Sequence, residues 1–244
     1  MTEMTSLAQP HDRDLAPVAA LFGDSTRVKM LTVLADGHAL PAGELARSAG
    51  VHPATATAHL RRLVEGGLVR VRVQGRHRYH ELAGEHVAAV LEALAQVAPP
   101  APVRSLRQHR DVAALTEART CYDHLAGRRG VELRDRLLAA GALRPINDRD
   151  HVMTAQGMRL IAELGIDPDR ITATRRVFAR SCVDWTHRRP HLAGALPAAI
   201  TGQLLARGWL SRNTGRGLRV APDYDQQLGQ WLSSQPEAIE TEHP

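Results

Sequence analysis

Apolar residues in the first third of the chain recur at intervals of three and four, which is the spacing of an amphipathic helix. Four helices are predicted in this way, over 15–22, 24–37, 41–50 and 52–67. Pro53 suits the first helical position of the last one, and Gly66 and Gly67 suit its end. The turn that precedes this helix is short, so the two helices on either side of it are expected to pack as a helix-turn-helix.

After Leu68 the spacing of the apolar residues changes from three or four positions to two. Valines alternate with arginines over 69–73, Gly75 follows Gln74 as a turn signal, and residues 77–82 read as a returning strand. A further helix is predicted over 84–97. This order of elements is that of a winged helix-turn-helix, in which helices, a tight turn and a further helix are followed by a two-stranded wing. The helix after the turn enters the DNA major groove.

The second half of the chain repeats part of this pattern. A heptapeptide of similar sequence occurs as LVEGGLV at 63–69, LLAAGAL at 137–143 and LLARGWL at 204–210. Each copy precedes a short extended stretch, a polar turn and another predicted helix. We therefore expect a mainly α fold with small β-hairpin wings (α+β), with two winged-helix-like units in the C-terminal half.

Composition shifts mark the expected domain boundaries. A polar start predicts a disordered tail over 1–14, and a cluster of prolines predicts a linker over 98–105. The DNA-binding domain is then expected over 15–97 and a sensor and dimerisation domain over 106–244. The N-terminus lacks the features of a signal peptide, and no apolar run reaches the ~18 residues of a membrane span. The protein is therefore expected in the cytoplasm, with no membrane partner and with both cysteines reduced.

Basic residues predict a polyanionic partner. Lys and Arg number 31 against 26 Asp and Glu, for a net charge of +5, and nearly all the basic residues are Arg, which suits phosphate and guanine. The predicted DNA contacts lie on the helix over 52–62 and on the wing: Pro53, Ala54, Thr55, Thr57, Ala58, His59, Arg61, Arg62, Arg76, His77 and Arg78. The alternative is an interaction module with a solvated basic face.

The stretch from LFGDSTRVKML to RHRYHEL resembles the DNA-binding domain of the ArsR/SmtB family of bacterial winged-helix repressors over 15–97. The resemblance implies a homodimer that binds operator DNA as a repressor and releases it when an effector binds. It assigns base and phosphate contacts to Pro53, Ala54, Thr55, Thr57, Ala58 and Arg61. The metal sites of the family cannot be assembled here, because the helix over 41–50 has no thiol and the helix over 84–97 offers only Glu85, His86 and Glu92.

Sensing chemistry is therefore expected in 106–244, which holds both cysteines. On the helix predicted to begin at 106, Cys121 and His124 would share a face. The candidate metal ligands are Cys121, His124, Cys182, His187 and His191. A Cys₂His₂ or Cys₂His site of this kind would suit Zn²⁺ or another thiophilic divalent ion.

Other roles stay open for these residues. The cysteines can be buried core groups in a regulator that responds to a redox signal or a small molecule. Arg188 and Arg189 are expected to pair with Asp123 or Asp184, and the alternative is that they form an anion pocket. Cys, His and Asp are also the ingredients of a nucleophilic triad, but the sequence shows neither a Gly-rich phosphate loop nor a nucleophile elbow, so an enzyme is not expected.

Overall fold

The computed structural model describes residues 13–99, 102–213 and 215–234. Their contacts divide the chain into two units, one within residues 1–34 and 38–87, the other formed by residues 35–37 and the chain from 88 onward. The boundary falls inside a helix, α5 (Glu85–Val97), and so precedes the predicted linker. The physical reason is that Glu92 of α5 forms ion pairs with Arg119 and Arg216 of the second unit.

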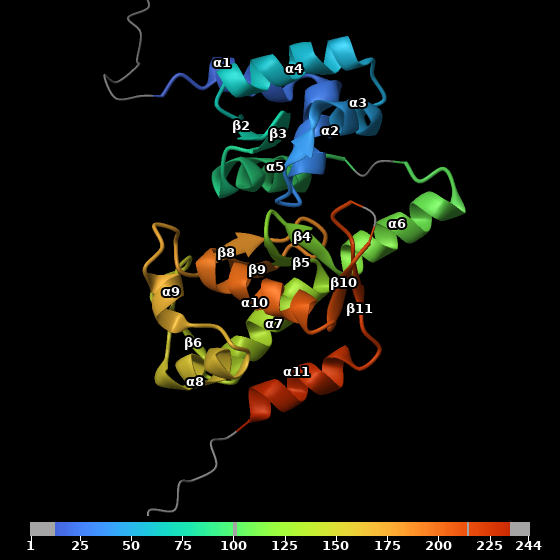
Figure 1. The fold of residues 1–244 in the computed structure, drawn as a ribbon. Helices are drawn as coiled ribbons and strands as arrows, with labels where there is room; N and C mark the ends of the chain where they lie inside the picture. The colour runs from blue at the N-terminus through green and yellow to red at the C-terminus, as the bar shows by residue number, and fades with distance from the viewer. Residues whose placement is uncertain (1–12, 100–101, 214, 235–244) are drawn as a thin grey trace, which may run out of the picture. The chain divides into compact units, whose positions relative to one another are not determined.

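The first unit is a winged helix-turn-helix (Figure 1). Its elements are α1 (Ala16–Phe22), α2 (Ser25–Leu34), β1 (Leu40–Pro41), α3 (Ala42–Ala49), α4 (Pro53–Glu65), β2 (Val69–Gln74) and β3 (His77–Leu82). The three strands form a sheet in the order β1-β3-β2. Buried leucines of α2, α3 and α4 form its core, including Leu34, Leu45 and Leu60. The predicted helices and wing of this unit are thus present.

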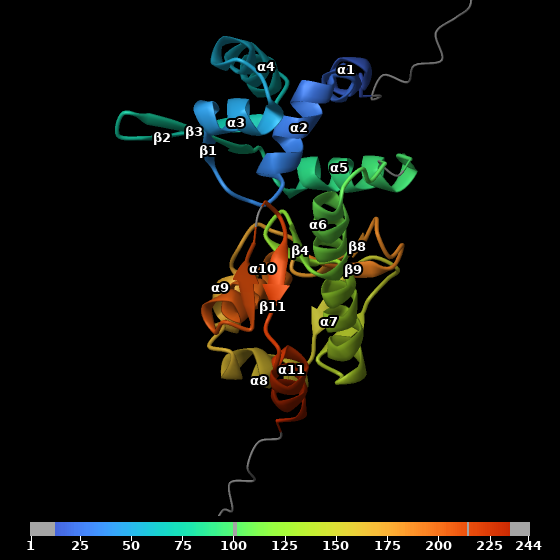
Figure 2. The ribbon, with the colours of Figure 1, turned by 90° about the vertical axis from the view of Figure 1, so that its right-hand side faces the viewer.

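The second unit consists of helices that alternate with two-stranded hairpins. Its elements are α6 (Leu106–Glu117), β4 (Arg119–Cys121), β5 (His124–Ala126), α7 (Arg128–Ala139), β6 (Leu143–Pro145), β7 (His151–Met153), α8 (Ala155–Glu163), α9 (Pro168–Thr172), β8 (Arg180–Val183), β9 (Pro190–Ala193), α10 (Ala195–Ala206), β10 (Leu210–Arg212), β11 (Leu218–Val220) and α11 (Tyr224–Ser233). Figures 1 and 2 show α8 and α11 packed together at the end of the unit opposite the hairpins β4–β5 and β8–β9.

The three heptapeptides occupy equivalent places. Each spans the end of a helix and the start of the first strand of a hairpin, in α4–β2, α7–β6 and α10–β10. In each, a glycine adopts a positive φ where the helix stops, with values of 70° at Gly67, 65° at Gly141 and 75° at Gly208. Glycine adopts this backbone conformation without the steric cost that a Cβ brings. The helix-to-hairpin junctions predicted for the C-terminal half are therefore present.

The second unit also contains a duplication that the heptapeptides do not cover. A hairpin precedes α7 and another precedes α10, and each pairs with the hairpin that follows the other helix. Ala118 accepts a hydrogen bond from Leu218 (2.9 Å), while Ala179 accepts one from His151 (2.9 Å). The two halves of the unit thus exchange backbone hydrogen bonds, and they are expected to fold together.

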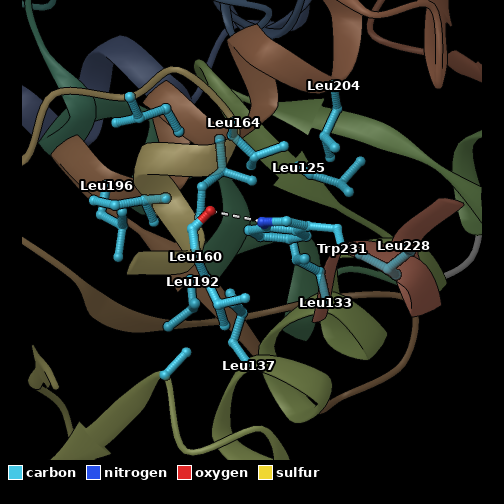
Figure 3. Packing of buried hydrophobic residues seen from close by; sticks show 14 of the residues in the cluster. Leu125, Leu133, Leu137, Leu160, Leu164, Leu192, Leu196, Leu204, Leu228 and Trp231 are labelled. Carbon is cyan, nitrogen blue, oxygen red and sulfur yellow. Dashed lines mark hydrogen bonds between the residues drawn. The ribbon is translucent and has the colours of Figure 1, made fainter. Parts of the chain in front are cut away.

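One apolar core joins these halves. Leucines from α7, α8, α10 and α11 pack together in it, and Trp231 donates a hydrogen bond from Nε1 to the Leu160 carbonyl at 2.7 Å (Figure 3). A buried indole N–H without a partner would cost free energy, so this bond fixes the position of α11 against α8.

The ends and the linker are only partly described. Most of the tail predicted over 1–14 lies outside the described residues, as do residues 100 and 101 of the linker. The described linker residues form no helix or strand up to Ser105, whose Oγ accepts a hydrogen bond from the Gln108 amide and so caps α6. Within the described part of the chain, every helix is too short or too polar to cross a bilayer.

Candidate functional site

The first candidate site is the exposed face of α4. Its start is fixed by Gly50, which ends α3 with a φ of 72°, and by His52, whose Nδ1 accepts a hydrogen bond from the Ala54 amide at 3.3 Å. Ala56, Leu60 and Leu63 bury the opposite face of the helix. The remaining predicted contacts on this helix are exposed, except His59: Pro53, Ala54, Thr55, Thr57, Ala58, Arg61 and Arg62.

His59 differs from the prediction that it lies on the solvent face. Its ring is half-buried, and its Nδ1 lies 3.7 Å from Asp24 Oδ1. Asp24 in turn accepts a hydrogen bond from the Arg27 amide at the start of α2. The His59 ring is therefore turned toward α2, where it contributes to the packing of the helix-turn-helix.

The wing carries the second group of predicted contacts. The strands pair in register up to Gln74 and His77, and Gly75 turns the chain with a φ of 59°. Arg76, His77 and Arg78 are exposed at this tip, which projects from the unit in Figure 2. Arg70, nearer the base of the wing, donates a hydrogen bond to Glu81 at 2.9 Å. The tip residues thus concentrate cationic and hydrogen-bonding groups where a nucleic-acid backbone can be reached.

The second candidate site lies in the second unit. Cys121, His124, Cys182 and His191 each offer a ligand atom, and these four atoms lie within 4.8 Å of one another. Three of the side chains are buried and Cys182 is partly buried. Tetrahedral zinc, with bonds of about 2.0 Å to nitrogen and 2.3 Å to sulfur, needs roughly 3.3–3.8 Å between ligand atoms. A small contraction of the cluster would reach that geometry.

The backbone places these ligands by strand pairing. Cys121 and His124 are cross-strand partners in β4–β5, and Cys182 and His191 are partners in β8–β9. The prediction that Cys121 and His124 share a helical face is therefore wrong, because α6 ends at Glu117. The physical reason is tertiary pairing, since Thr120 of β4 donates a backbone hydrogen bond to Arg216 (2.9 Å).

His187 lies apart from the cluster. Its Nδ1 is 2.9 Å from Thr186 Oγ1 and 3.5 Å from Asp184 Oδ1, in the loop between β8 and β9. The structure therefore brings together four of the five candidate ligands, one Cys and one His from each hairpin.

The surroundings shift the pKa values of the two thiols in opposite directions. The neighbouring Cys121 thiol and the imidazoles of His124 and His191 hold the pKa of Cys182 well below its usual range, although burial opposes this. The pKa of Cys121 is raised, because this thiol is the donor to Cys182 and because it is buried. One sulfur of the pair is thus prepared as a thiolate, the form that binds metal ions.

Both hairpins turn through strained backbone near these ligands. Tyr122 between β4 and β5 has a φ of 61°, and Arg188 between β8 and β9 has a φ of 52°. Among the described residues these are the only ones other than glycine with a positive φ. Such strain costs about 1–3 kcal/mol at each position and persists only where the surroundings enforce it. At Tyr122 the amide donates to the Ala35 carbonyl at 2.8 Å.

A buried ion network includes Arg119 and Asp184, which are each two positions from one of the two cysteines. Arg119 is fully buried, and its Nη2 lies 2.8 Å from Asp184 Oδ2 and 3.3 Å from Glu92 Oε2. Asp184 also accepts a hydrogen bond from the Gly127 amide at 2.7 Å, so it joins β8 to the start of α7. Each charge is therefore compensated inside the protein, and the network fixes both Cys-bearing strands.

The predicted partners of the two aspartates are wrong. Asp184 pairs with Arg119, Asp123 pairs with Arg176 at 2.6 Å, and Arg189 pairs with Asp135 at 2.6 Å. Sequence reasoning missed Arg119 as a member of the site. The signal was present, because RTCYD at 119–123 and RSCVD at 180–184 are related, and HLAG follows in both hairpins.

Comparisons with known proteins agree with this architecture. Residues 22–72 match a helix-turn-helix domain family. The HTH-type transcriptional regulator YdfF of Bacillus subtilis (strain 168) is 41% identical over 199 residues, which cover 82% of this chain and 88% of YdfF. A cadmium resistance transcriptional regulatory protein CadC homolog of Staphylococcus aureus is 35% identical over 86 residues, or 35% of this chain and 71% of the relative.

Among solved structures, the homodimeric winged helix-turn-helix domain of Mb0332 from Mycobacterium bovis, a possible ArsR-family regulator, is 33% identical. It covers 37% of this chain and 88% of its own, with a TM-score of 0.32. A winged helix-turn-helix with a basic wing defines a DNA-binding regulator of transcription rather than an enzyme. The chain belongs to the HTH-type transcriptional regulators, and its helix-turn-helix domain covers residues 22–72.

Proposed function

We propose that the protein is a homodimeric repressor whose affinity for operator DNA changes when a thiophilic divalent ion binds Cys121, His124, Cys182 and His191. The observation that carries the proposal is the meeting of these four ligand atoms within 4.8 Å, from two hairpins whose cysteines lie 61 positions apart. Repression and dimerisation follow from the family resemblance. The CadC homolog supplies an example of a relative whose name refers to cadmium.

The donor set favours Zn²⁺ over hard ions, because two sulfurs and two imidazole nitrogens suit borderline and soft metals. Asp123 Oδ1 lies 3.5 Å from His124 Nδ1. A carboxylate beside the far nitrogen orients the imidazole and leaves Nε2 as the ligand atom. An ion held in this way would tie β4–β5 to β8–β9, and so one half of the duplicated unit to the other.

A measurement on the full chain tests the proposal. Operator DNA is first selected from a random duplex library, with both the zinc-loaded and the chelator-treated protein, and its affinity is then measured by fluorescence anisotropy in each state. We expect one zinc per chain by elemental analysis and a change in DNA affinity of about 5- to 150-fold, the usual range of allosteric coupling. Equal affinities in both states would contradict metal control of DNA binding.

The DNA-binding face has its own prediction. Arg76→Ala is expected to weaken binding to all duplexes and to reduce the slope of log K against log salt by about 1, because one phosphate contact is lost. Replacement of Arg61, whose side chain is 73% exposed, by alanine should likewise lower the affinity of the protein for DNA. Arg159→Ala, at an exposed position of α8 in the second unit, is the control. If Arg159→Ala has the same effect as Arg76→Ala, the wing is not the contact surface.

A second candidate function is redox sensing, which the closeness of the two thiols favours. A peroxide could oxidise Cys121 and Cys182 to a disulfide, with two electrons and two protons passing to the peroxide to give water. The same DNA-binding assay, with hydrogen peroxide in place of zinc, separates the two candidates. Thiol titration of the treated protein then shows whether the disulfide formed.

A further inference from the structure

A cavity of about 420 Å³ lies in the second unit beside β7. The lining comes from the β6–β7 hairpin, α8, α9 and the segment before β8. Most of it is apolar, from Ile146, Val152, Met153, Met158, Val177 and Phe178. Its volume falls within the range of about 300–1,000 Å³ that is typical of small-molecule sites.

A polar group is placed in this apolar lining. His151 is only 3% exposed, and neither of its ring nitrogens has a hydrogen-bond partner among the residues that the structure describes. A buried imidazole of this kind costs free energy unless a ligand completes its hydrogen bonds.

The charge of the cavity narrows the ligand class. Its lining contains no lysine or arginine that would bind an anion, and its one carboxylate, Asp150, accepts a hydrogen bond from Asn147. Burial lowers the pKa of His151, and Arg134 lowers it further, while Asp150 and the Arg149 carbonyl oppose this. A neutral imidazole has one donor and one acceptor nitrogen. An uncharged ligand is therefore favoured.

We propose that this cavity binds a small uncharged molecule that has an apolar body and one hydrogen-bonding group facing His151. The proposal does not depend on the metal site. Its position suggests how a ligand would act, because Ala179 of the lining accepts the backbone hydrogen bond of His151 and directly precedes β8, the strand of Cys182.

Methyl NMR of the full chain tests for binding with indole as the probe. The chain has five methionines, of which Met153 and Met158 line the cavity and Met30 is buried in the first unit. With ¹³C-methyl methionine, indole should shift the signals of Met153 and Met158 and leave that of Met30 unchanged. Leucine variants of Met153 and Met158 assign these two signals. Absence of shifts at millimolar indole would overturn the proposal.

Two variants and a second probe locate the site. Val177→Trp fills the cavity and should abolish the indole shifts, whereas Val112→Trp, the same change on exposed α6, should retain them. Indole should also bind about fivefold more tightly than indene, which has the same shape without the N–H, as one neutral hydrogen bond predicts. His151→Phe should remove that preference. Shifts that persist in Val177→Trp, or equal binding of both probes to the unmodified protein, would contradict the assignment.

Discussion

Cys182→Ser is expected to lower the zinc affinity of the protein by about 10²- to 10³-fold. A four-ligand zinc site of this type is worth roughly 10–16 kcal/mol, so one ligand accounts for about 3–4 kcal/mol. Cys182 should be the most sensitive position, because the neighbouring Cys121, His124 and His191 side chains lower the pKa of its thiol and so favour the thiolate. Competition with a chromogenic chelator measures the affinity, and circular dichroism checks that the fold is retained.

His187 provides the matched control. His191→Ala should lose zinc affinity nearly as strongly as Cys182→Ser, whereas His187→Ala should keep it, since this ring lies beside Thr186 and Asp184. The two histidines belong to the same short segment, so the comparison separates ligation from general disturbance of β8–β9. A loss of affinity in His187→Ala as large as in His191→Ala would show that a different set of ligands holds the ion.

Arg119→Met should destabilise the second unit by about 3–5 kcal/mol, which is the usual cost of removing one partner of a buried ion pair. Glu92 would keep Arg216 as a partner at 2.9 Å. Asp184, which is fully buried, would lose its only cationic partner among the described arginines and lysines and keep neutral donors. All three tryptophans, Trp185, Trp209 and Trp231, belong to this unit, so urea unfolding followed by tryptophan fluorescence reports its stability directly.

Arg128→Met is the control for this change. Arg128 also forms ion pairs, with Glu117 and Glu132, but its side chain is 49% exposed. Water screens such pairs, so the expected loss is about 0–1 kcal/mol. Equal destabilisation by the two variants would mean that the Arg119 network does not depend on its burial.

The order of elements in the first unit could be predicted from the sequence because each element has a local signal. The alternation over 69–73 fixes the faces of β2, and Gly75 and Gly67 supply positive φ angles that few other residues adopt. Three heptapeptides with the same glycine in the same place predict the same helix-to-strand junction three times. His59 was misplaced, because helical periodicity does not reveal Asp24 on a neighbouring helix.

The metal-ligand cluster could be predicted only in part. Its residue types and the pairing of the two segments were available from the sequence, but the segment after Glu117 had the appearance of a continuing helix. The register of β4–β5, which sets Cys121 opposite His124, depends on hydrogen bonds to residues 216–218, almost a hundred positions away. The ion pairs of Arg119 with Glu92 and Asp184 could not be predicted in the same way, since the sequence does not show which charged residues meet in the fold.

The sequence by itself determined that this protein is a winged-helix DNA-binding regulator with repeated helix–hairpin units, because turns, caps and hydrophobic periods act over a few residues. Only the tertiary structure decided which residues share a site. The backbone pairing between hairpins of the two halves of the second unit brings Cys121, His124, Cys182 and His191 together. His187 is left outside this cluster. Such convergence depends on packing and on long-range backbone pairing, which local sequence patterns do not determine.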